Sequence, residues 1–255
     1  MTSRRRILQE NIKLHKSEAY FYEANHPEIF NVLEQSRLKT QIAILKNEAS
    51  GGLCVDVGSG TGNLGRLLRS AGFSVVACDL SREMLEQNDA EFRVRCEAST
   101  LPIRTQCASL VTGYSLFHHL PDVENALKEA CRVAKEKALM YFDHDNFTHG
   151  VQKKATRVVK IRGVRAATLG LIWQIAHPHY LFRFAQYVFG GRRKHLIYLR
   201  NVDWNLTDGN IFQFQQFKKI LQKNGFTGSL SVYSEGSYIK VQRRARACEA
   251  ALTAH

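Results

Sequence analysis

The sequence predicts an α/β protein in which seven strands form a doubly wound, mostly parallel sheet, with a helical cap inserted after the fifth strand. Short apolar runs alternate with segments of helical periodicity over residues 53–142, and a glycine-rich turn follows the first run. Strands that alternate with helices in this way form βαβ units, whose strands are parallel. The alternation stops over residues 144–207 and resumes from residue 208. We interpret the interruption as the cap.

Residues 1–50 predict an N-terminal helical segment. Apolar residues recur at helical spacing over residues 27–47. They are Ile29, Val32, Leu33, Leu38, Ile42 and Leu45. The first 25 residues are polar around an aromatic cluster. We expect Tyr20 and Tyr22 of that cluster either to pack or to close over a bound ligand.

Residues 51–143 form the predicted core of the sheet. Apolar runs predict strands at residues 53–57, 74–78, 91–95, 108–114 and 138–142. A helix at residues 63–70 ends before Gly72, Ser81 caps a second helix, and residues 122–134 form a third.

Residues 208–255 complete the sheet. A helix is predicted over residues 208–223 with Gly225 as its stop, followed by strands at residues 230–233 and 238–241. The Glu235-Gly236 pair between these strands predicts a hairpin. Because the chain has four prolines and no long polar linker, we expect residues 1–255 to form a single domain.

Charge is distributed unevenly along the chain. Residues 1–150 hold 18 Lys and Arg against 19 Asp and Glu, whereas residues 151–255 hold 18 against 4. The formal net charge is +13. This asymmetry favours a face that meets phosphate, anionic lipid or nucleic acid, with a solvated basic surface as the alternative. The six cysteines show no CxxC pair, which favours a reducing, cytoplasmic compartment.

A glycine-rich turn carries the clearest functional signal. The first apolar run contains Asp56 and leads into Gly58-Ser-Gly-Thr-Gly62, and Asp79 ends the next strand 21 positions after Gly58. Glycines allow backbone N–H groups to approach a ligand, and a carboxylate at this strand end accepts hydrogen bonds from both ribose hydroxyls. We therefore predict a nucleoside site. Asn63 stands where a dinucleotide site needs its third glycine, which disfavours NAD.

Four segments, in order, resemble the motifs of the class I S-adenosylmethionine-dependent methyltransferases, in particular the type 11 methyltransferase domain. They begin with the turn just described and span residues 54–62, 76–85, 96–103 and 109–120. The resemblance fades after Phe142. It implies a Rossmann-like sheet, S-adenosylmethionine as cofactor, and methyl transfer as the reaction.

The resemblance also implies roles for individual residues along the cofactor. The methionine end of the cofactor would contact the glycine turn and its preceding acid, which are Asp56, Gly58, Ser59, Gly60 and Gly62. Asp79 would hold the ribose. The adenine would lie against Leu80, Met84, Glu97 and Ala98, and the methyl group would lie near Tyr114 and Ser115.

Methyl transfer demands alignment above all, because the sulfonium already activates the methyl group. Holding the acceptor in place supplies about 7–11 kcal/mol of the barrier. An oxygen acceptor also needs a base, and the candidates are His118, His119, Asp143 and His144, with Asp145 beside them. Residues 143–145, together with His149, form an alternative metal cluster. Their spacing matches no specific site, and we predict no metal.

The predicted cap is the most individual part of the chain. Residues 166–189 are rich in aliphatic and aromatic side chains, and residues 151–200 hold 11 Lys and Arg and no acid. Polar residues, among them Gln174, Pro178 and Arg183, interrupt the apolar stretch and exclude a transmembrane helix. An amphipathic segment at a membrane surface, a lid over an apolar substrate, and a packing cap all remain open.

We expect a methyltransferase that acts on a small-molecule or lipid-linked acceptor, located in the cytoplasm and peripheral to an anionic membrane surface. An RNA methyltransferase is the alternative that the basic half favours, although nucleic acid is the less favoured partner because the aromatics are bunched among aliphatics. A non-catalytic cofactor-binding protein is the second alternative. The sequence does not predict an oligomeric state.

Overall fold

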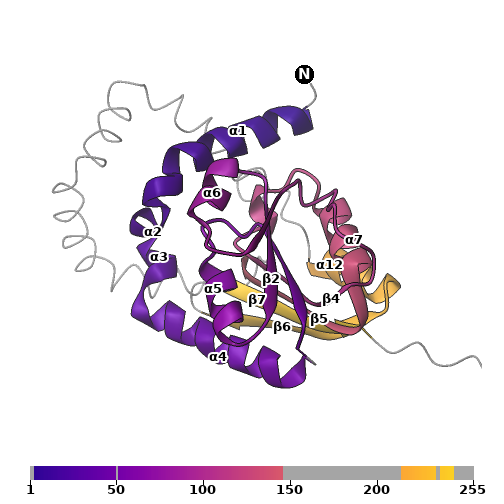
Figure 1. The fold of residues 1–255 in the computed structure, drawn as a ribbon. Helices are drawn as coiled ribbons and strands as arrows, with labels where there is room; N and C mark the ends of the chain where they lie inside the picture. The colour runs from indigo at the N-terminus through magenta and orange to yellow at the C-terminus, as the bar shows by residue number, and fades with distance from the viewer. Residues whose placement is uncertain (1–2, 50, 146–213, 234–235, 244–255) are drawn as a thin grey trace, which may run out of the picture.

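The fold is seen in a computed structural model that describes residues 3–49, 51–145, 214–233 and 236–243 (Figure 1). The cap predicted over residues 144–207 lies outside the described residues, apart from the strand end at His144 and Asp145. The start of the helix predicted from residue 208 lies outside them as well.

Seven strands form one sheet in the order β3-β2-β1-β4-β5-β7-β6. Their bounds are β1 Leu53–Val57, β2 Ser74–Asp79, β3 Phe92–Arg95, β4 Ala108–Tyr114, β5 Ala134–Asp145, β6 Phe226–Tyr233 and β7 Gly236–Arg243. Strands β1 to β5 are parallel, and β7 runs antiparallel to both β5 and β6. The predicted seven-stranded, mostly parallel sheet is confirmed.

Helices cover both faces of the sheet because strand pleating sends consecutive side chains to opposite sides. Cys54 and Leu110 pack with α4 (Val32–Glu48) and α5 (Asn63–Ser70) on one face. Their neighbours Val55 and Val111 pack on the other face, in a core that also holds side chains of α7 (Val123–Val133) and α12 (Phe214–Lys223). The sheet is therefore doubly wound, as predicted.

The predicted helix over residues 27–47 is divided in two. Asn31 has extended backbone angles and its side chain accepts a hydrogen bond from the backbone N–H of Glu34, so α4 starts after it and α3 (Pro27–Phe30) ends before it. Val32 and Leu33, which the helical spacing placed among the inward positions, are 84% and 83% exposed. They are not inward, because the buried face of α4 runs through Glu34, Leu38, Ile42 and Leu45, and Val32 and Leu33 lie off that face.

The strands at the carboxyl side are longer than predicted. β5 begins at Ala134 and continues to Asp145, and the hairpin strands start at Phe226 and end at Arg243. β5 pairs with β4 on one side and β7 on the other, and such pairing extends a strand beyond the apolar run that marks its centre.

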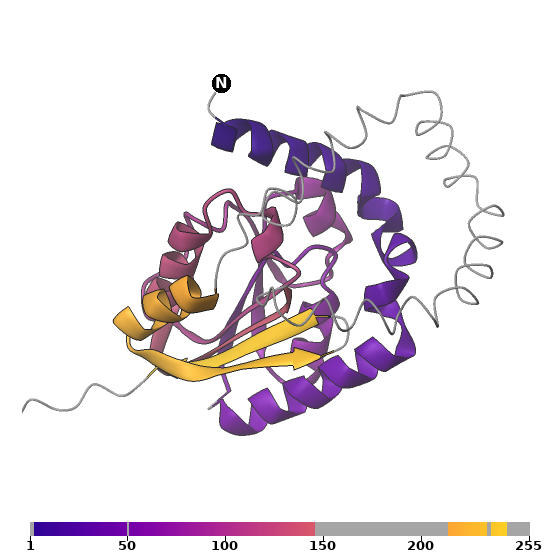
Figure 2. The same cartoon turned by 180° about the vertical axis from the view of Figure 1, so that it is seen from behind.

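The N-terminal residues form an arc of short helices around the carboxyl ends of the parallel strands (Figures 1 and 2). We call residues 3–33 the N-terminal arc. It consists of α1 (Ser3–Glu18), η1 (Ala19–Phe21), α2 (Tyr22–Asn25), α3 and the first turn of α4. α1 contacts α6 (Arg82–Gln87), which follows β2. Within the described residues, no helix combines the length and apolar character needed to cross a membrane.

Candidate functional site

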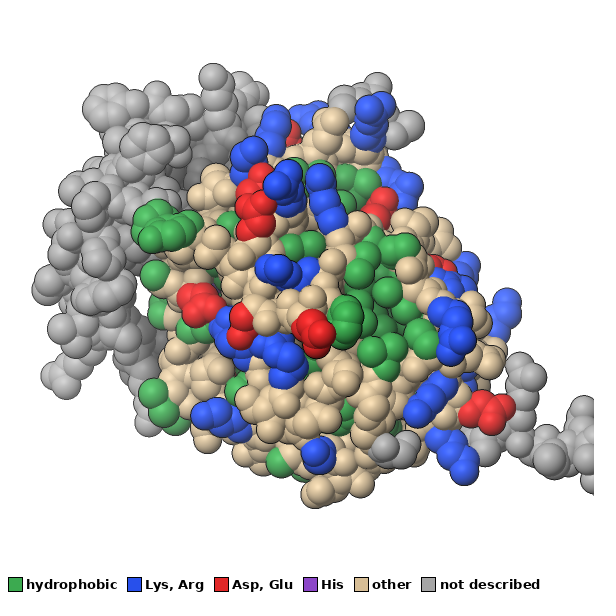
Figure 3. All heavy atoms as spheres, viewed as in Figure 1, with side chains coloured by type: hydrophobic (Ala, Val, Ile, Leu, Met, Phe, Trp, Pro, Cys, Tyr) green, Lys and Arg blue, Asp and Glu red, His purple; other side chains and the backbone are tan. Residues whose placement is uncertain are grey.

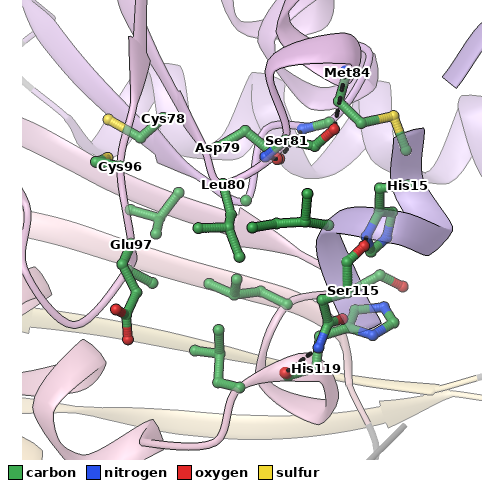
Figure 4. Close-up of a pocket in the computed structure, with 18 of the residues that line it drawn as sticks. His15, Cys78, Asp79, Leu80, Ser81, Met84, Cys96, Glu97, Ser115 and His119 are labelled. Carbon is green, nitrogen blue, oxygen red and sulfur yellow. Dashed lines mark hydrogen bonds between the residues drawn. The ribbon is translucent and has the colours of Figure 1, made fainter. Parts of the chain in front are cut away.

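A pocket of about 800 Å³, open to solvent, lies between α1 and the carboxyl ends of β1, β2 and β4. This position is where open α/β sheets bind ligands, and the size suits a small ligand. Figure 4 shows side chains of β2, α6, α1 and the β4 end facing one another across it. Ten of the predicted site residues line it, namely Gly58, Gly60, Asp79, Leu80, Met84, Glu97, Ala98, Tyr114, Ser115 and His119.

The glycine turn after β1 forms one wall of the pocket. Gly58 and Gly60 have φ values of +67° and +51°, in the left-handed region that glycine adopts readily. A Cβ at Gly58 would lie 2.6 Å from Cδ1 of Leu116, whereas a Cβ at Gly60 would meet no atom of the described residues within 4 Å. Gly60 therefore leaves free space at the wall, which is the cradle that a bound ligand needs.

Asp79 closes the turn from the end of β2. One carboxylate oxygen accepts the N–H of Gly60 and the other accepts the N–H of Ser81, each at 2.8 Å. A carboxylate offers about four lone-pair sites, so two remain for a diol. Burial raises the pKa of Asp79, with His15 and the backbone amides opposing this rise.

Asp56 lies under the turn in a smaller adjoining pocket, which Ser59 and Tyr22 also line. Its Oδ1 accepts the hydroxyl of Thr112 at 2.7 Å, and its Oδ2 has no hydrogen-bond partner among the described residues. Burial raises the pKa of Asp56 to about 6. Gly62 lies in neither pocket; it precedes α5, and a Cβ there would clash with Asn88.

The end of the pocket near β3 is where the resemblance places the adenine. Leu80, Met84 and Ala98 supply apolar walls, and Ser81 caps α6 by accepting the N–H of Met84 at 3.3 Å, as predicted. Glu97 is engaged by α1, because Arg4 donates a hydrogen bond to its carboxylate at 2.5 Å.

Two cysteines also line this end. Cys78 lies in β2 and Cys96 follows β3, and a side-chain hydrogen bond joins them. That hydrogen bond and, after it, burial raise the pKa of Cys78. The same hydrogen bond lowers the pKa of Cys96, against the opposing effect of burial. Their adjacency follows from strand pairing, which the position of Asp79 beside Arg95 illustrates.

The opposite end of the pocket combines β4 with α1. Tyr114 and Ser115 lie at the end of β4 as predicted, and His119 follows in η2 (Phe117–His119). His15 of α1 places its ring edge-on to that of His119, with centroids 5.3 Å apart. Asn11 holds α1 in place by donating to the carbonyl of His119 at 3.3 Å.

The sequence analysis missed the α1 residues of the pocket, which are Leu8, Asn11, Ile12 and His15. Of the two tyrosines proposed to close over a ligand, Tyr22 lines the pocket, whereas Tyr20 is 77% exposed. No motif marks these positions, and only their place on one face of α1 connects them.

Three of the four residues predicted to act as bases lie outside the pocket lining. Asp143 is fully buried and accepts hydrogen bonds from Arg37 at 2.8 Å and from the hydroxyl of Tyr141. These partners tie it to α4 rather than to the pocket.

His144 and His118 are each paired behind the pocket wall. Nδ1 of His144 lies 2.7 Å from the hydroxyl oxygen of Ser115, and burial lowers the pKa of His144. Nδ1 of His118 lies 2.8 Å from Oδ1 of Asp145, whose carboxylate also accepts the N–H of Leu116. Both pairs fix the turn after β4, on which Ser115 and His119 stand.

Across the described residues, no group of three or more His, Cys, Asp or Glu side chains is arranged to hold a metal ion. His149, which completed the alternative metal cluster, lies outside the described residues.

Comparison with known proteins finds similarity to methyltransferases. A family model described as a methyltransferase domain matches residues 55–142. An uncharacterized chloroplastic methyltransferase of Arabidopsis thaliana is 35% identical over 103 residues, which are 34% of this chain and 29% of that protein. The malonyl-[acyl-carrier protein] O-methyltransferase of Pectobacterium atrosepticum is 31% identical over 97 residues, or 36% and 38% of the two chains. The chain thus spans about a third of the length of these relatives.

Solved structures share the fold over most of the chain. A structure described as a putative S-adenosylmethionine-dependent methyltransferase of Methanococcus maripaludis superposes with a TM-score of 0.53 at 19% identity, covering 89% of this chain and 94% of that one. Magnesium protoporphyrin IX methyltransferase of Synechocystis, solved with S-adenosylmethionine, gives 0.52 at 13% identity, covering 92% and 97%.

The domain match begins inside β1 and ends inside β5, and the pocket lies where these parallel strands end. Residues 55–142 thus match a methyltransferase domain, and the sheet shares its fold with S-adenosylmethionine-dependent methyltransferases.

Proposed function

We propose that this protein transfers the methyl group of S-adenosylmethionine to a small-molecule or lipid-linked acceptor. The observation that carries the proposal is the geometry of Asp79. Two backbone amides orient its carboxylate at the pocket wall and leave it lone pairs for the two ribose hydroxyls. Nothing else need move to form that contact.

The other walls fit the remaining parts of the cofactor. The free space beside Gly60 accommodates the methionine portion. Oδ2 of Asp56, which has no hydrogen-bond partner among the described residues, is an acceptor for its ammonium group, directly or through water. The apolar side chains near β3 suit a flat aromatic base. When bound, S-adenosylmethionine supplies a methyl group already activated by a sulfonium.

The chain's own contribution is then to orient the acceptor and to take its proton. We assign both tasks to the end of the pocket formed by β4, η2 and α1. Among the four predicted bases only His119 lines the pocket, so it is the preferred base for an oxygen acceptor. His144 and His118 act as positioning residues in this proposal, because their side chains hold the turn from behind. Asp143 instead links β5 to α4 through Arg37.

The acceptor class is inferred from the pocket and from the names of relatives. The pocket is open to solvent beside the proposed cofactor contacts, so a small group or the reactive end of a longer chain can enter it. The malonyl-[acyl-carrier protein] O-methyltransferase is named for a carrier-linked acceptor and the Synechocystis enzyme for a porphyrin. These names support a small-molecule or carrier-linked acceptor here.

Calorimetry with S-adenosylmethionine and its demethylated product tests the proposal. We expect micromolar affinity for both, and Asp79→Ala should weaken both by about 2–4 kcal/mol because two charge-assisted hydrogen bonds are lost. Asp89→Asn is the matched control, since Asp89 is an exposed partner of Arg69 outside the pocket. Equal affinity of the wild type and Asp79→Ala would refute the assignment of Asp79 to the ribose.

An RNA methyltransferase is the second candidate, favoured by the 18 Lys and Arg against 4 acids in residues 151–255. The basic, aromatic-rich residues 151–200 would bind the RNA in that case, and an anionic membrane or lipid-phosphate substrate in the first. We infer a cytoplasmic protein peripheral to a membrane from the same residues. Filter binding with RNA, run beside co-sedimentation with anionic vesicles, separates the two candidates.

A further inference from the structure

The outer face of α1 carries exposed basic residues towards both of its ends, and Lys13 and Lys16 among them also pair with Glu10 and Glu83. Arg5, Arg6, Lys13 and Lys16 are all exposed, and with Gln9 and Ser17 they occupy one side of the helix. Arg4 instead turns toward Glu97 at the pocket. In Figure 3 the Lys and Arg side chains gather at the top of the molecule, over α1.

Exposed apolar side chains continue this surface along the N-terminal arc. Tyr20 follows directly after α1, and Val32 and Leu33 form the first turn of α4. Figure 3 shows apolar side chains at the left edge of the molecule, below the basic ones. Large apolar side chains that are almost fully exposed on one edge mark an interaction surface.

The same arc borders the pocket. The inner face of α1 supplies Leu8, Asn11, Ile12 and His15 to the pocket lining, while its outer face carries the basic residues. A ligand on the outer face of α1 is therefore separated by one helix diameter, about 10–12 Å, from the end of the pocket where we place the methyl acceptor.

We propose that the N-terminal arc is a docking surface for an anionic lipid bilayer, which brings the mouth of the pocket to the lipid headgroups. Basic residues beside exposed aromatic and aliphatic residues are the combination that interfacial helices use, since the cations meet anionic headgroups and the apolar side chains enter the acyl boundary. The inference rests on the proposed function, because it identifies the lipid-linked acceptor as the substrate class.

The charge and the apolar residues contribute separately. Each basic residue at an anionic surface raises partitioning about fivefold, and this contribution decays within a Debye length of roughly 8 Å at physiological salt. The contribution of Val32, Leu33 and Tyr20 comes from buried apolar area and persists when salt is raised.

Co-sedimentation of the full chain with vesicles tests the surface. The vesicles are phosphatidylcholine alone and phosphatidylcholine mixed with phosphatidylserine. We expect binding to the mixed vesicles, a loss of about 25-fold for Arg5→Gln/Arg6→Gln, and a salt-insensitive loss for Val32→Ser/Leu33→Ser. The matched controls are Lys218→Gln/Lys219→Gln on α12, which removes the same charge, and Phe92→Ser on the exposed edge of β3.

Affinity for the demethylated cofactor is measured on the same samples and should not change, since none of the substituted residues lines the pocket. The inference is overturned if the wild type ignores the mixed vesicles, if the α12 control loses as much binding as the arc variants, or if the arc variants lose RNA binding instead. A protein that binds the cofactor but not vesicles keeps the proposed function. A protein that binds vesicles but no cofactor loses the proposed function and keeps the surface.

Discussion

At the scale of single residues, the charged form of the Asp56 carboxyl lowers the stability of the folded protein, because the carboxyl is buried. Its carboxyl is buried with one oxygen bonded to Thr112 and the other unpaired among the described residues. Burial raises its pKa from 3.8 to about 6, so the folded protein binds this proton more tightly than the unfolded chain does. The stabilising effect of that proton is complete below about pH 4 and is lost as the pH rises through about 6.

Asp56→Asn should therefore stabilise the cofactor-free protein at neutral pH, by about 1–3 kcal/mol, while leaving its stability near pH 4 less changed. Urea unfolding of the variant and the wild type at both ends of that range measures the difference. Asp89→Asn, at an exposed carboxyl, is the control. A variant that is less stable than the wild type at neutral pH would show that Asp56 is paired when charged. Because Asp56 is proposed to accept the ammonium group of the cofactor, the same variant should bind S-adenosylmethionine more weakly.

Alanine substitutions at Gly60 and Gly51 can be compared to separate the effect of backbone strain from that of ligand contact. Gly51 has a similar left-handed φ of +68°, and its added Cβ would also meet no atom of the described residues within 4 Å. Alanine at either position should cost about 1–2 kcal/mol of stability from strain alone. Only Gly60→Ala should also reduce cofactor affinity, since Gly60 lines the pocket and Gly51 does not. Thermal unfolding and calorimetry on the two variants check this, and equal affinities would mean that the cofactor does not approach Gly60.

At the scale of elements, α1 differs from the helices that pack on the sheet. Its ion pairs Arg4–Glu97 and Lys16–Glu83 are partly exposed, and such pairs contribute about 0–1 kcal/mol each. Ile7 is the one aliphatic side chain of α1 in the buried core, compared with Leu38, Ile42 and Leu45 in α4. α1 is therefore held weakly, and much of its inner face is turned to the pocket.

Hydrogen exchange should reveal this difference. Amides of α1 should exchange faster than those of α4 in the free protein, and addition of the demethylated cofactor should slow them because the ligand fills the pocket that α1 covers. Amides of α12, on the other face of the sheet, serve as the control and should not change. Protection of α12 equal to that of α1 would indicate a global effect, and no change in α1 would remove it from the cofactor site.

The contrast between α1 and the helices that pack on the sheet also explains which parts of the fold and site the sequence could predict. The sheet was predictable because its strands bury both faces, and the cofactor-binding turn was predictable because glycines and Asp79 have one local arrangement. α1 was not assigned to the pocket because Asn11 and His15 face a ligand cavity rather than a core, so no apolar periodicity marks them. Asp143 was placed at the correct strand end, but its partner Arg37 lies 106 residues away and no local pattern connects them.

At the scale of the whole molecule, the sheet is assembled from distant parts of the chain. β5 pairs with β7 through Phe142 and Ile239, so the second neighbour of β5 comes from almost a hundred residues later in the sequence. Pairing these strands closes a loop of that length, and the entropic cost of closing a loop grows with the logarithm of its length. Strands β1 to β5, at whose carboxyl ends the pocket lies, are paired with one another over shorter stretches of sequence.

That separation has a consequence during synthesis. At about 5–20 residues per second, the partner strand of β5 leaves the ribosome roughly 5–20 s after β5 itself. Throughout that interval the central part of the sheet has an open edge of unpaired amides and carbonyls, made of the residues from Leu139 to Phe142 that are fully buried in the finished protein. An edge of this kind pairs readily with other extended chains. The time between β5 and β7 is thus the period in which this protein is most exposed to misassembly and most in need of a chaperone.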